Sequence, residues 1–198
     1  MEYKSLNDEE LIKLAKNEDA RALATLIDRY QKPLFNFILQ MVNCRDTAED
    51  ILQDSFLKAI TALPKFRYKN FKNYLYKIAN NTVIDRYRKK KREGIIEIPL
   101  QFSVNNCGEE KNIEIKDIKA LSPEDEFYKS ELSRQLNNAI QQLPHEQKQV
   151  FLLHEYSQLT FEEIAKTTNC SISTVLSRFR YAIEKLREKL KEEYDEEN

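Results

Sequence analysis

Glycine is almost absent from this sequence, with Gly94 and Gly108 the only two among 198 residues. Loops that cradle phosphate groups need several glycines, so a motif of that kind is excluded. The only two histidines, His145 and His154, have no paired cysteines near them, and no two cysteines form a CxxC motif. These gaps predict no metal site and no cofactor. Without a Cys/His couple or paired catalytic carboxylates, neither an enzyme nor a small-molecule substrate is expected.

Long apolar runs are absent as well. No stretch of about 18 apolar residues exists, so no membrane-spanning helix is expected. The first ten residues, MEYKSLNDEE, are acidic and polar, which is not the pattern of a signal peptide. The expected location of the chain is therefore the cytoplasm.

Both glycines fall in residues 93–123, together with Pro99 and Pro123. This segment shows no long helical period and carries more acid than base, so we expect a flexible acidic linker. Outside it, apolar residues recur at helical spacing along most of the chain. The sequence therefore predicts an all-α protein in which two small helical domains, residues 1–92 and 124–198, flank the linker.

Positive charge is concentrated in one segment, although the whole chain has a net charge of −1. Residues 63–92 contain 11 lysines and arginines and a single acid, Asp85, which gives a local net charge of +10. Tyrosines and phenylalanines are interleaved with these bases. Positive side chains follow a phosphate backbone and aromatic rings stack on unpaired bases, so the pattern favours single-stranded nucleic acid. A solvated basic helix, with its aromatic side chains in a hydrophobic core, is the plainer alternative.

Residues 160–187 have the pattern of a helix-turn-helix. Thr160 and Glu163 form a capping box, Asn169 suits a left-handed turn, and Ser171 is a good N-cap for a second helix. On that helix the apolar residues Ile172, Val175, Phe179, Ala182, Ile183 and Leu186 are expected to face inward. The opposite face carries small polar and basic side chains that fit a DNA major groove. An ordinary helical hairpin is the alternative.

An acidic helix is expected after residue 45, with Asp46 as its cap and Glu49 at the capping-box position. Taken alone, its exposed acids indicate only a solvated surface.

The segment from Leu143 to Leu190 resembles region 4 of extracytoplasmic-function sigma factors, a branch of the sigma-70 family. The resemblance rests on LP at 143–144, LTFEEIA at 159–165, TV at 174–175, SR at 177–178 and EKLR at 184–187. In that family, region 4 reads the promoter −35 element. The resemblance implies DNA contacts by Ser173, Thr174, Ser177, Arg178, Arg180 and Tyr181. Arg178 is expected to be the best base partner, because a guanidinium can pair with guanine through two hydrogen bonds.

This sequence departs from the family pattern at two positions of the second helix. The family often has glycine where Ser173 stands and a basic residue where Leu176 stands. These changes are expected to weaken one contact or to alter the −35 sequence that is read.

The strings AEDILQDSF at 48–56 and YLYKIANN at 74–81 resemble region 2 of the same family, with Tyr74 where tryptophan is usual. Region 2 binds the clamp of the largest polymerase subunit through an acidic helix, which implies contacts by Glu49, Asp50, Gln53, Asp54 and Phe56. It also opens the −10 element and holds a flipped base. For that step the resemblance implies Phe66, Arg67, Tyr68, Lys77, Asn80, Asn81 and Arg88.

The resemblance implies three partners: core RNA polymerase, through the clamp of its largest subunit and the flap of its second subunit; promoter DNA; and an anti-sigma factor. Two alternatives stay open. A stand-alone helix-turn-helix regulator would explain residues 160–187 but would leave the basic aromatic segment and the acidic helix without a role. A structural helical adaptor would bind no DNA.

Overall fold

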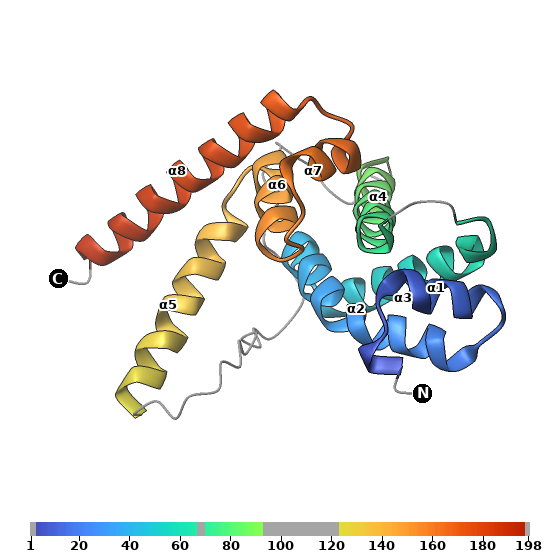
Figure 1. Cartoon of the computed structure of the whole chain (residues 1–198). Helices are drawn as coiled ribbons and strands as arrows, with labels where there is room; N and C mark the ends of the chain where they lie inside the picture. Colours follow the sequence, from blue (N-terminus) through green and yellow to red (C-terminus); the bar gives the residue numbers. More distant parts are fainter. Residues whose placement is uncertain (1–2, 67–69, 93–122, 197–198) are drawn as a thin grey trace.

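The computed structural model describes residues 3–66, 70–92 and 123–196, and within them it contains only helices, turns and short connections (Figure 1). The expectation of an all-α protein is therefore confirmed. None of the described helices is long and apolar enough to cross a lipid bilayer. Of the expected linker, residues 93–122 lie outside the described part of the chain, and Pro123 begins a helix.

Two groups of helices make up the described structure. The first, here called the N-terminal bundle, consists of two short 3₁₀ helices, η1 (Tyr3–Ser5) and η2 (Leu63–Lys65), with α1 (Asp8–Lys16), α2 (Ala20–Val42), α3 (Arg45–Ala62) and α4 (Phe71–Arg92). The second, the C-terminal bundle, consists of α5 (Pro123–Gln141), α6 (His145–Glu155), α7 (Phe161–Thr168) and α8 (Ile172–Glu196).

Polar residues fix where the first helices begin. Asn7 and Glu10 form a capping box at α1, and the Asp19 carboxylate accepts hydrogen bonds from the backbone N–H groups of Arg21 and Ala22 at α2. The prediction that Asp46 caps α3 is wrong. The N-cap is Cys44, whose side chain makes no capping bond, and Asp46 lies inside the first turn, where a negative charge still favours the helix dipole.

The core of the N-terminal bundle lies around α2. Leu34, Phe37 and Ile38 of this helix are fully buried, and Phe37 meets the ring of Tyr76 from α4 edge to face at 5.4 Å. Such edge-to-face pairs add to the free energy gained by burying the rings. Because α4 packs on both α2 and α3, its position is fixed along much of its length.

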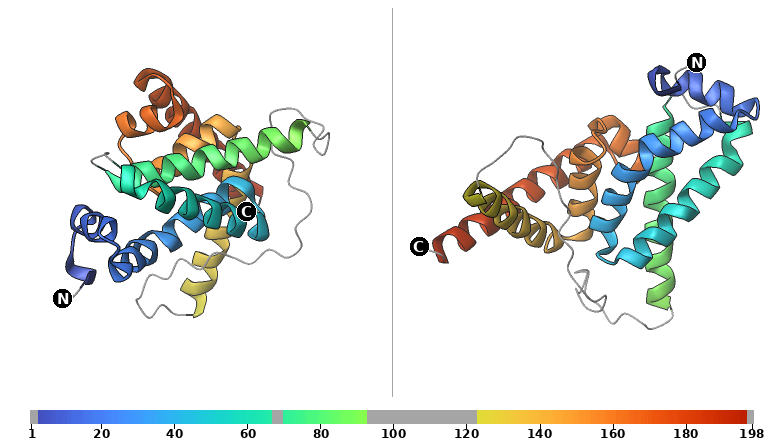
Figure 2. Two further views of the ribbon diagram at one scale, coloured as in Figure 1. Left: turned by 90° about the vertical axis from the view of Figure 1, so that its right-hand side faces the viewer. Right: turned by 90° about the horizontal axis from the view of Figure 1, so that it is seen from below.

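The core of the C-terminal bundle is built from the apolar run on α6 and the inner face of α8. Val150, Leu152 and Leu153 are fully buried against Val175 and Ala182. α5 also packs against α8, and Figure 2 shows both helices extending beyond the rest of the molecule. The last part of α8 is therefore less enclosed than its first part, which belongs to the helix-turn-helix.

The two bundles touch each other through α2 with α6 and α4 with α7 (Figure 2). Gln40 of α2 donates through Nε2 to the Asn137 side-chain oxygen of α5 at 3.1 Å, and Gln141 donates to the side-chain oxygen of Gln40 at 3.0 Å. Gln40 is only 4% exposed, so this contact is shielded from water.

Candidate nucleic-acid interface

The helix-turn-helix forms as the sequence predicts. The backbone N–H of Thr160 donates to Glu163 Oε2 at 2.9 Å, and the Glu163 N–H donates to Thr160 Oγ1 at 3.3 Å, which completes the capping box of α7. Asn169 ends α7 in the left-handed region at φ 54°. The Ser171 hydroxyl accepts from the Thr174 N–H at 3.1 Å and caps α8. Local hydrogen bonds therefore set the angle at which α8 leaves the turn.

The outward face of α8 is open to solvent. Ser173, Ser177, Arg180 and Tyr181 are exposed, and Thr174 is half-buried. The Arg180 guanidinium lies over the Tyr181 ring at 5.2 Å, so the two side chains form one flat, positively charged surface. This surface has the size and chemistry of a recognition helix.

Arg178 does not point the same way as Arg180. Its Nη1 donates to Cys170 Sγ at 3.2 Å, so the guanidinium lies against the turn between α7 and α8 and is half-buried. Of these two arginines of the recognition face, Arg180 is the one that is exposed to solvent.

Two apolar side chains of α8 are exposed. Ile172 was expected to face inward, but it is 45% exposed, because the first residue of the helix projects beyond the core. Leu176 is 46% exposed, one turn after Ser173 and one turn before Arg180. Leu176 was not among the DNA contacts expected from the sequence, although its helical spacing from Ser173 and Arg180 places it on the same face.

The acidic side chains on α3 share a surface with one apolar neighbour. Asp50, Gln53 and Asp54 are exposed, and Asp50 forms an ion pair with Arg86 of α4 at 2.8 Å. Leu57, one turn further, is 65% exposed, and it was not among the polymerase contacts expected from the sequence.

The other two residues expected on this surface are less exposed. Glu49 is half-buried and pairs with Arg45 within the helix at 2.9 Å, and Phe56 is only 9% exposed in the core.

The side chains expected at the −10 element are divided among several environments. Arg67 and Tyr68 lie outside the described residues. Phe66 is 6% exposed and packs against Phe71 at 5.8 Å and Tyr74 at 5.0 Å, so it takes the core role that the sequence left open. On α4, Asn81 and Arg88 are exposed and Lys77 is half-buried.

Asn80 is almost completely enclosed. It is 1% exposed, and its side-chain oxygen accepts a hydrogen bond from Gln149 Nε2 of α6 at 2.6 Å. One turn earlier, Tyr76 is fully buried beside Ser157, and burial raises the pKa of its hydroxyl to about 12. The C-terminal bundle therefore covers part of the α4 surface expected to meet DNA.

Glu163 joins the helix-turn-helix to α4. Its Oε1 accepts hydrogen bonds from the side-chain amides of Asn70, at 3.2 Å, and Asn73. Burial alone would raise the pKa of this carboxyl, but the hydrogen bonds from Thr160 and Asn73 lower it below its usual range. Glu163 is thus ionised at neutral pH in both of its roles.

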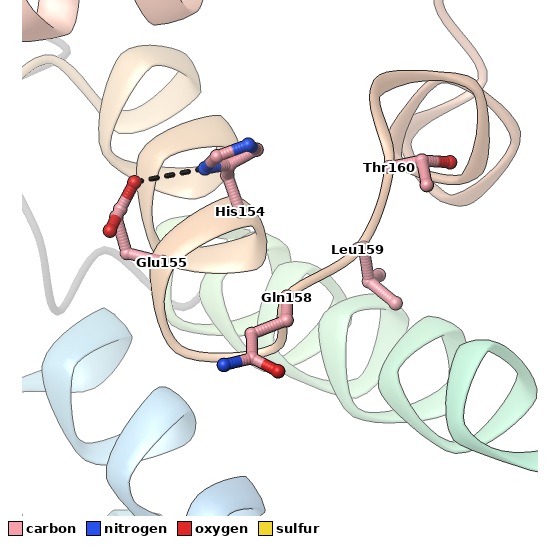
Figure 3. A pocket seen from close by; sticks show the side chains of 5 residues that line it. All are labelled: His154, Glu155, Gln158, Leu159 and Thr160. Carbon is pink, nitrogen blue, oxygen red and sulfur yellow. Dashed lines mark hydrogen bonds and ion pairs between the residues drawn. The ribbon is translucent and has the colours of Figure 1, made fainter.

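A shallow cleft of about 330 Å³ lies between the end of α6 and the start of α7, lined by His154, Glu155, Gln158, Leu159 and Thr160 (Figure 3). His154 bonds Glu155 at 2.9 Å, and its ring stacks on Phe161 at 4.9 Å, which gives this histidine a packing role. Across residues 3–66, 70–92 and 123–196 no cluster of three or more His, Cys, Asp or Glu side chains is placed to hold a metal ion.

Two family models match this chain. The model described as Sigma-70 region 2 matches residues 26–93, and the model described as Sigma-70, region 4 matches residues 133–186. The first match covers α2 to α4, and the second covers the helix-turn-helix.

Curated relatives match along almost the whole length. The RNA polymerase sigma-H factor of Pseudomonas aeruginosa is 31% identical over 186 residues, which cover 90% of this chain and 92% of that protein. The ECF RNA polymerase sigma-E factor of Haemophilus influenzae is 30% identical, with 93% and 96% covered.

Two solved structures are similar to the described fold. One is the sigma factor RpoE in complex with the anti-sigma factor NepR from Bartonella quintana, with a TM-score of 0.61, 26% identity, and 83% of this chain and 98% of that chain covered. The other is CnrH in complex with the cytosolic domain of CnrY, with a TM-score of 0.64 over 93% and 97% of the two chains. At 19% identity, the second shows a shared fold.

Proposed function

The chain belongs to the extracytoplasmic-function branch of the sigma-70 family, and from that premise we propose how its two bundles divide the work of promoter recognition. As a sigma factor it binds core RNA polymerase and directs promoter-specific initiation of transcription. The proposed domains are residues 1–92 for the −10 element and 124–198 for the −35 element, with 93–123 between them.

The open face of α8 is the single observation that best supports this division. Ser173, Ser177, Arg180 and Tyr181 project from the second helix of a helix-turn-helix, which is the element that enters a major groove. We assign −35 contacts to these residues and to Thr174. Arg178, lying against Cys170, is suited to a phosphate near the turn.

The N-terminal bundle would bind core polymerase and the −10 strand. The exposed carboxylates of Asp50 and Asp54 offer negative charge for a basic clamp surface, and Leu57 adds apolar area between exposed side chains. On α4, Lys77, Asn81 and Arg88 are accessible to a strand of DNA. Side-chain amides hydrogen-bond base edges and basic groups follow phosphates, so these residues are suited to an opened duplex.

Sigma factors are DNA-recognition proteins, and we propose that this chain has no active site of its own and acts in the cytoplasm. We also expect an anti-sigma factor among its partners, because a solved sigma factor 26% identical to this chain is held by one. A stand-alone regulator is disfavoured, since it has no use for the acidic surface of α3.

Transcription in vitro tests the proposal. Purified core RNA polymerase is incubated with genomic promoter fragments, with and without the full chain, and transcripts are mapped. New start sites that require both core and the chain are expected. Specific DNA binding without core, and no new transcript with it, would instead favour the stand-alone regulator.

The surface of α3 proposed to contact core polymerase is tested by measuring how tightly variants of the full chain bind to core. Asp54→Lys is compared with Asp28→Lys, which reverses another exposed carboxylate on α2. Only Asp54→Lys is expected to weaken binding to core, by about tenfold or more, because it places a positive charge against the clamp. Equal binding by both variants would remove α3 from the proposal.

A further inference from the structure

One lysine of α1 holds the chain just before α4. Lys16 Nζ donates a hydrogen bond to the backbone carbonyl oxygen of Phe66 at 2.6 Å, although the two residues are 50 positions apart in the sequence. The same ammonium lies 6.0 Å from the centroid of the Phe66 ring. Hydrogen bonds from a charged donor are shorter and stronger than neutral ones, and a cation near an aromatic face adds a further attraction. Lys16 therefore contacts both the backbone and the side chain of Phe66.

The helix that carries Lys16 is itself fixed at both ends. At its start, the Asp8 carboxylate accepts hydrogen bonds from the side chains of Arg29 and Tyr30 on α2. At its end, the chain leaves the helix through a turn in which Glu18 adopts φ 65°. Lys16 lies in the last turn of α1. Because the helix is already fixed against α2, the bond to Phe66 has to overcome only the entropy of ordering the lysine side chain.

The bond from Lys16 restrains a part of Phe66 that its ring contacts do not. The Phe66 ring is 6% exposed and packs on Phe71 and Tyr74 at the start of α4. These contacts act on the ring and do not by themselves fix the peptide unit that follows. A peptide unit is planar and rigid, so a bond to its carbonyl oxygen fixes the orientation of the whole unit. Lys16 therefore sets the direction in which the chain leaves the aromatic core.

The peptide unit after Phe66 leads to residues that are expected at the −10 element. Arg67 and Tyr68, which the family resemblance implies for the flipped base, follow directly in the sequence and lie outside the described residues. Further on, the side-chain oxygen of Asn70 accepts a hydrogen bond from the Asn73 N–H at 3.1 Å, at the start of α4. The two ends of this short connection are thus held separately, one by α1 and the other by the cap of α4.

From this geometry we infer that Lys16 is a positioning residue for the −10 element, acting through the Phe66 carbonyl. The inference rests on the proposed role of the N-terminal bundle in promoter opening. A binding surface that is ordered in advance loses less free energy when its ligand arrives, so the bond strengthens the contact with an unpaired base. Lys16 itself does not need to touch the DNA.

Two plainer roles of Lys16 make different predictions. The side chain belongs to an exposed residue, and an exposed lysine can bind a DNA phosphate. Removing a phosphate contact weakens binding to all sequences alike and reduces the salt slope by about one. A lysine that only stabilises the fold also affects all sequences alike, and its removal lowers the free energy of unfolding. A positioning residue instead changes the discrimination among bases at particular positions.

Three variants of the full chain separate these roles. Lys16→Met removes the ammonium and keeps an unbranched apolar stem, whereas Lys16→Arg keeps a positively charged donor. The matched control is Lys13→Met, which removes the same charge from another exposed lysine of α1. Each variant is combined with core RNA polymerase. Circular dichroism and urea titrations establish that it is folded under the conditions of the assay.

Promoter melting is measured on duplex DNA by the permanganate reactivity of unpaired thymines. Lys16→Met is expected to melt the −10 element about threefold to thirtyfold less well than wild type, which is the range expected for loss of one hydrogen bond. Lys16→Arg is expected to stay within about threefold of wild type, because a guanidinium also donates to a carbonyl, and Lys13→Met within about twofold. Normal melting by Lys16→Met, or equal losses in Lys16→Met and Lys13→Met, would overturn the inference.

Base preference distinguishes positioning from the two plainer roles. The affinity of each holoenzyme is measured for pre-melted templates in which the unpaired −10 bases are changed one at a time, at several salt concentrations. Lys16→Met is expected to lose about threefold or more of the discrimination at one or two positions and to keep the wild-type salt slope. A uniform loss at every position, or a slope smaller by about one, would overturn the positioning role. If that happens while core-dependent transcription persists, the function as a sigma factor stands and only the role of Lys16 is lost.

Discussion

The two surfaces assigned to DNA differ in how they are presented. The outward face of α8 consists of hydroxyls, the Arg180 guanidinium, a half-exposed tyrosine and Leu176, all of them accessible to solvent. The side of α4 that carries Asn73, Asn80 and Tyr87 consists of amides and aromatic rings, and α6 and α7 lie on it. Serine and arginine gain little from burial, whereas a tyrosine ring gains much, and an asparagine tolerates burial when its amide is hydrogen-bonded. A surface of amides and aromatic rings, which we propose for unstacked bases, is thus also a surface on which another protein element can dock.

Asn81 is an exposed amide on α4, outside the side of the helix that packs on α6 and α7, so changing it tests whether α4 opens DNA. Asn81→Ala leaves the contacts with the C-terminal bundle intact, because Asn81 is exposed. It is expected to reduce promoter melting about fivefold to 150-fold, since hydrogen bonds from a side chain to a base edge are worth roughly 1–3 kcal/mol. Permanganate reactivity of unpaired thymines measures the effect, and a template already mismatched across the −10 element should restore it. Normal melting of a duplex promoter would mean that α4 only attracts DNA.

Lys148 on α6 is a buried ammonium group, and its effect on stability depends on pH. Its side chain is 1% exposed and donates to Gln141 at 2.5 Å, and burial lowers its pKa from 10.5 to about 7. The unfolded chain therefore binds more protons than the folded one between pH 7 and pH 10.5, so this group makes stability rise with pH in that window and gives its full cost below pH 7.

Lys148→Met is accordingly expected to raise the free energy of unfolding by about 1–4 kcal/mol at pH 6 and by less at pH 9. Urea titrations at the two pH values measure the change. A variant that is less stable than wild type at pH 6 would show that the interactions of the ammonium outweigh the cost of burying it.

On α8, Arg178 and Arg180 are expected to behave differently. Arg180→Ala should cost about 1–3 kcal/mol at the −35 element and relax the preference at one position, because we assign its exposed guanidinium to a base edge. Arg178→Ala should weaken all −35 variants to a similar, smaller extent. Holoenzyme binding to a panel of −35 duplexes measures both, and the reverse pattern would give the base contact to Arg178.

The smallest expected effect concerns Leu176, an apolar side chain on the otherwise polar face of α8. An apolar contact with a thymine methyl group is worth about 0.8 kcal/mol, or about a fourfold change in affinity. Replacing −35 thymines by uracil, one at a time, should weaken wild type at one position and leave Leu176→Ala unaffected there. If uracil has no effect at any position, the exposed leucine does not read the methyl group.

Sequence alone was most informative where structure depends on neighbours along the chain. The capping box of Thr160 and Glu163, the left-handed Asn169 and the Ser171 cap were all predictable, because each depends on residues at most four positions apart. The same logic failed at α3, where Asp46 and Glu49 have the spacing of a capping box, but the N-cap is Cys44, two residues before Asp46.

Contacts between segments far apart in the sequence could not be predicted from local patterns. Gln141 bonds Gln40 across 101 positions, and Gln149 bonds Asn80 across 69. Amides carry no charge and follow no period, so their pairing leaves no pattern in the sequence. The positions of Phe56 and Phe66 in the core were equally hidden, because an aromatic residue beside basic or acidic neighbours reads the same whether it stacks on a base or on another ring.

Glu163 bears on how fast the protein can respond. One of its carboxylate oxygens caps α7, and the other accepts the amides of Asn70 and Asn73. If α4 moved away from α7, the second oxygen would be hydrated while the first kept its bond, so the capping box of α7 would stay intact. Separation of the two bundles would then involve no local refolding. Rigid-body movements of whole domains occur in microseconds to milliseconds. The delay between release of this protein and its capture by polymerase would be set by diffusion and encounter rather than by its own rearrangement.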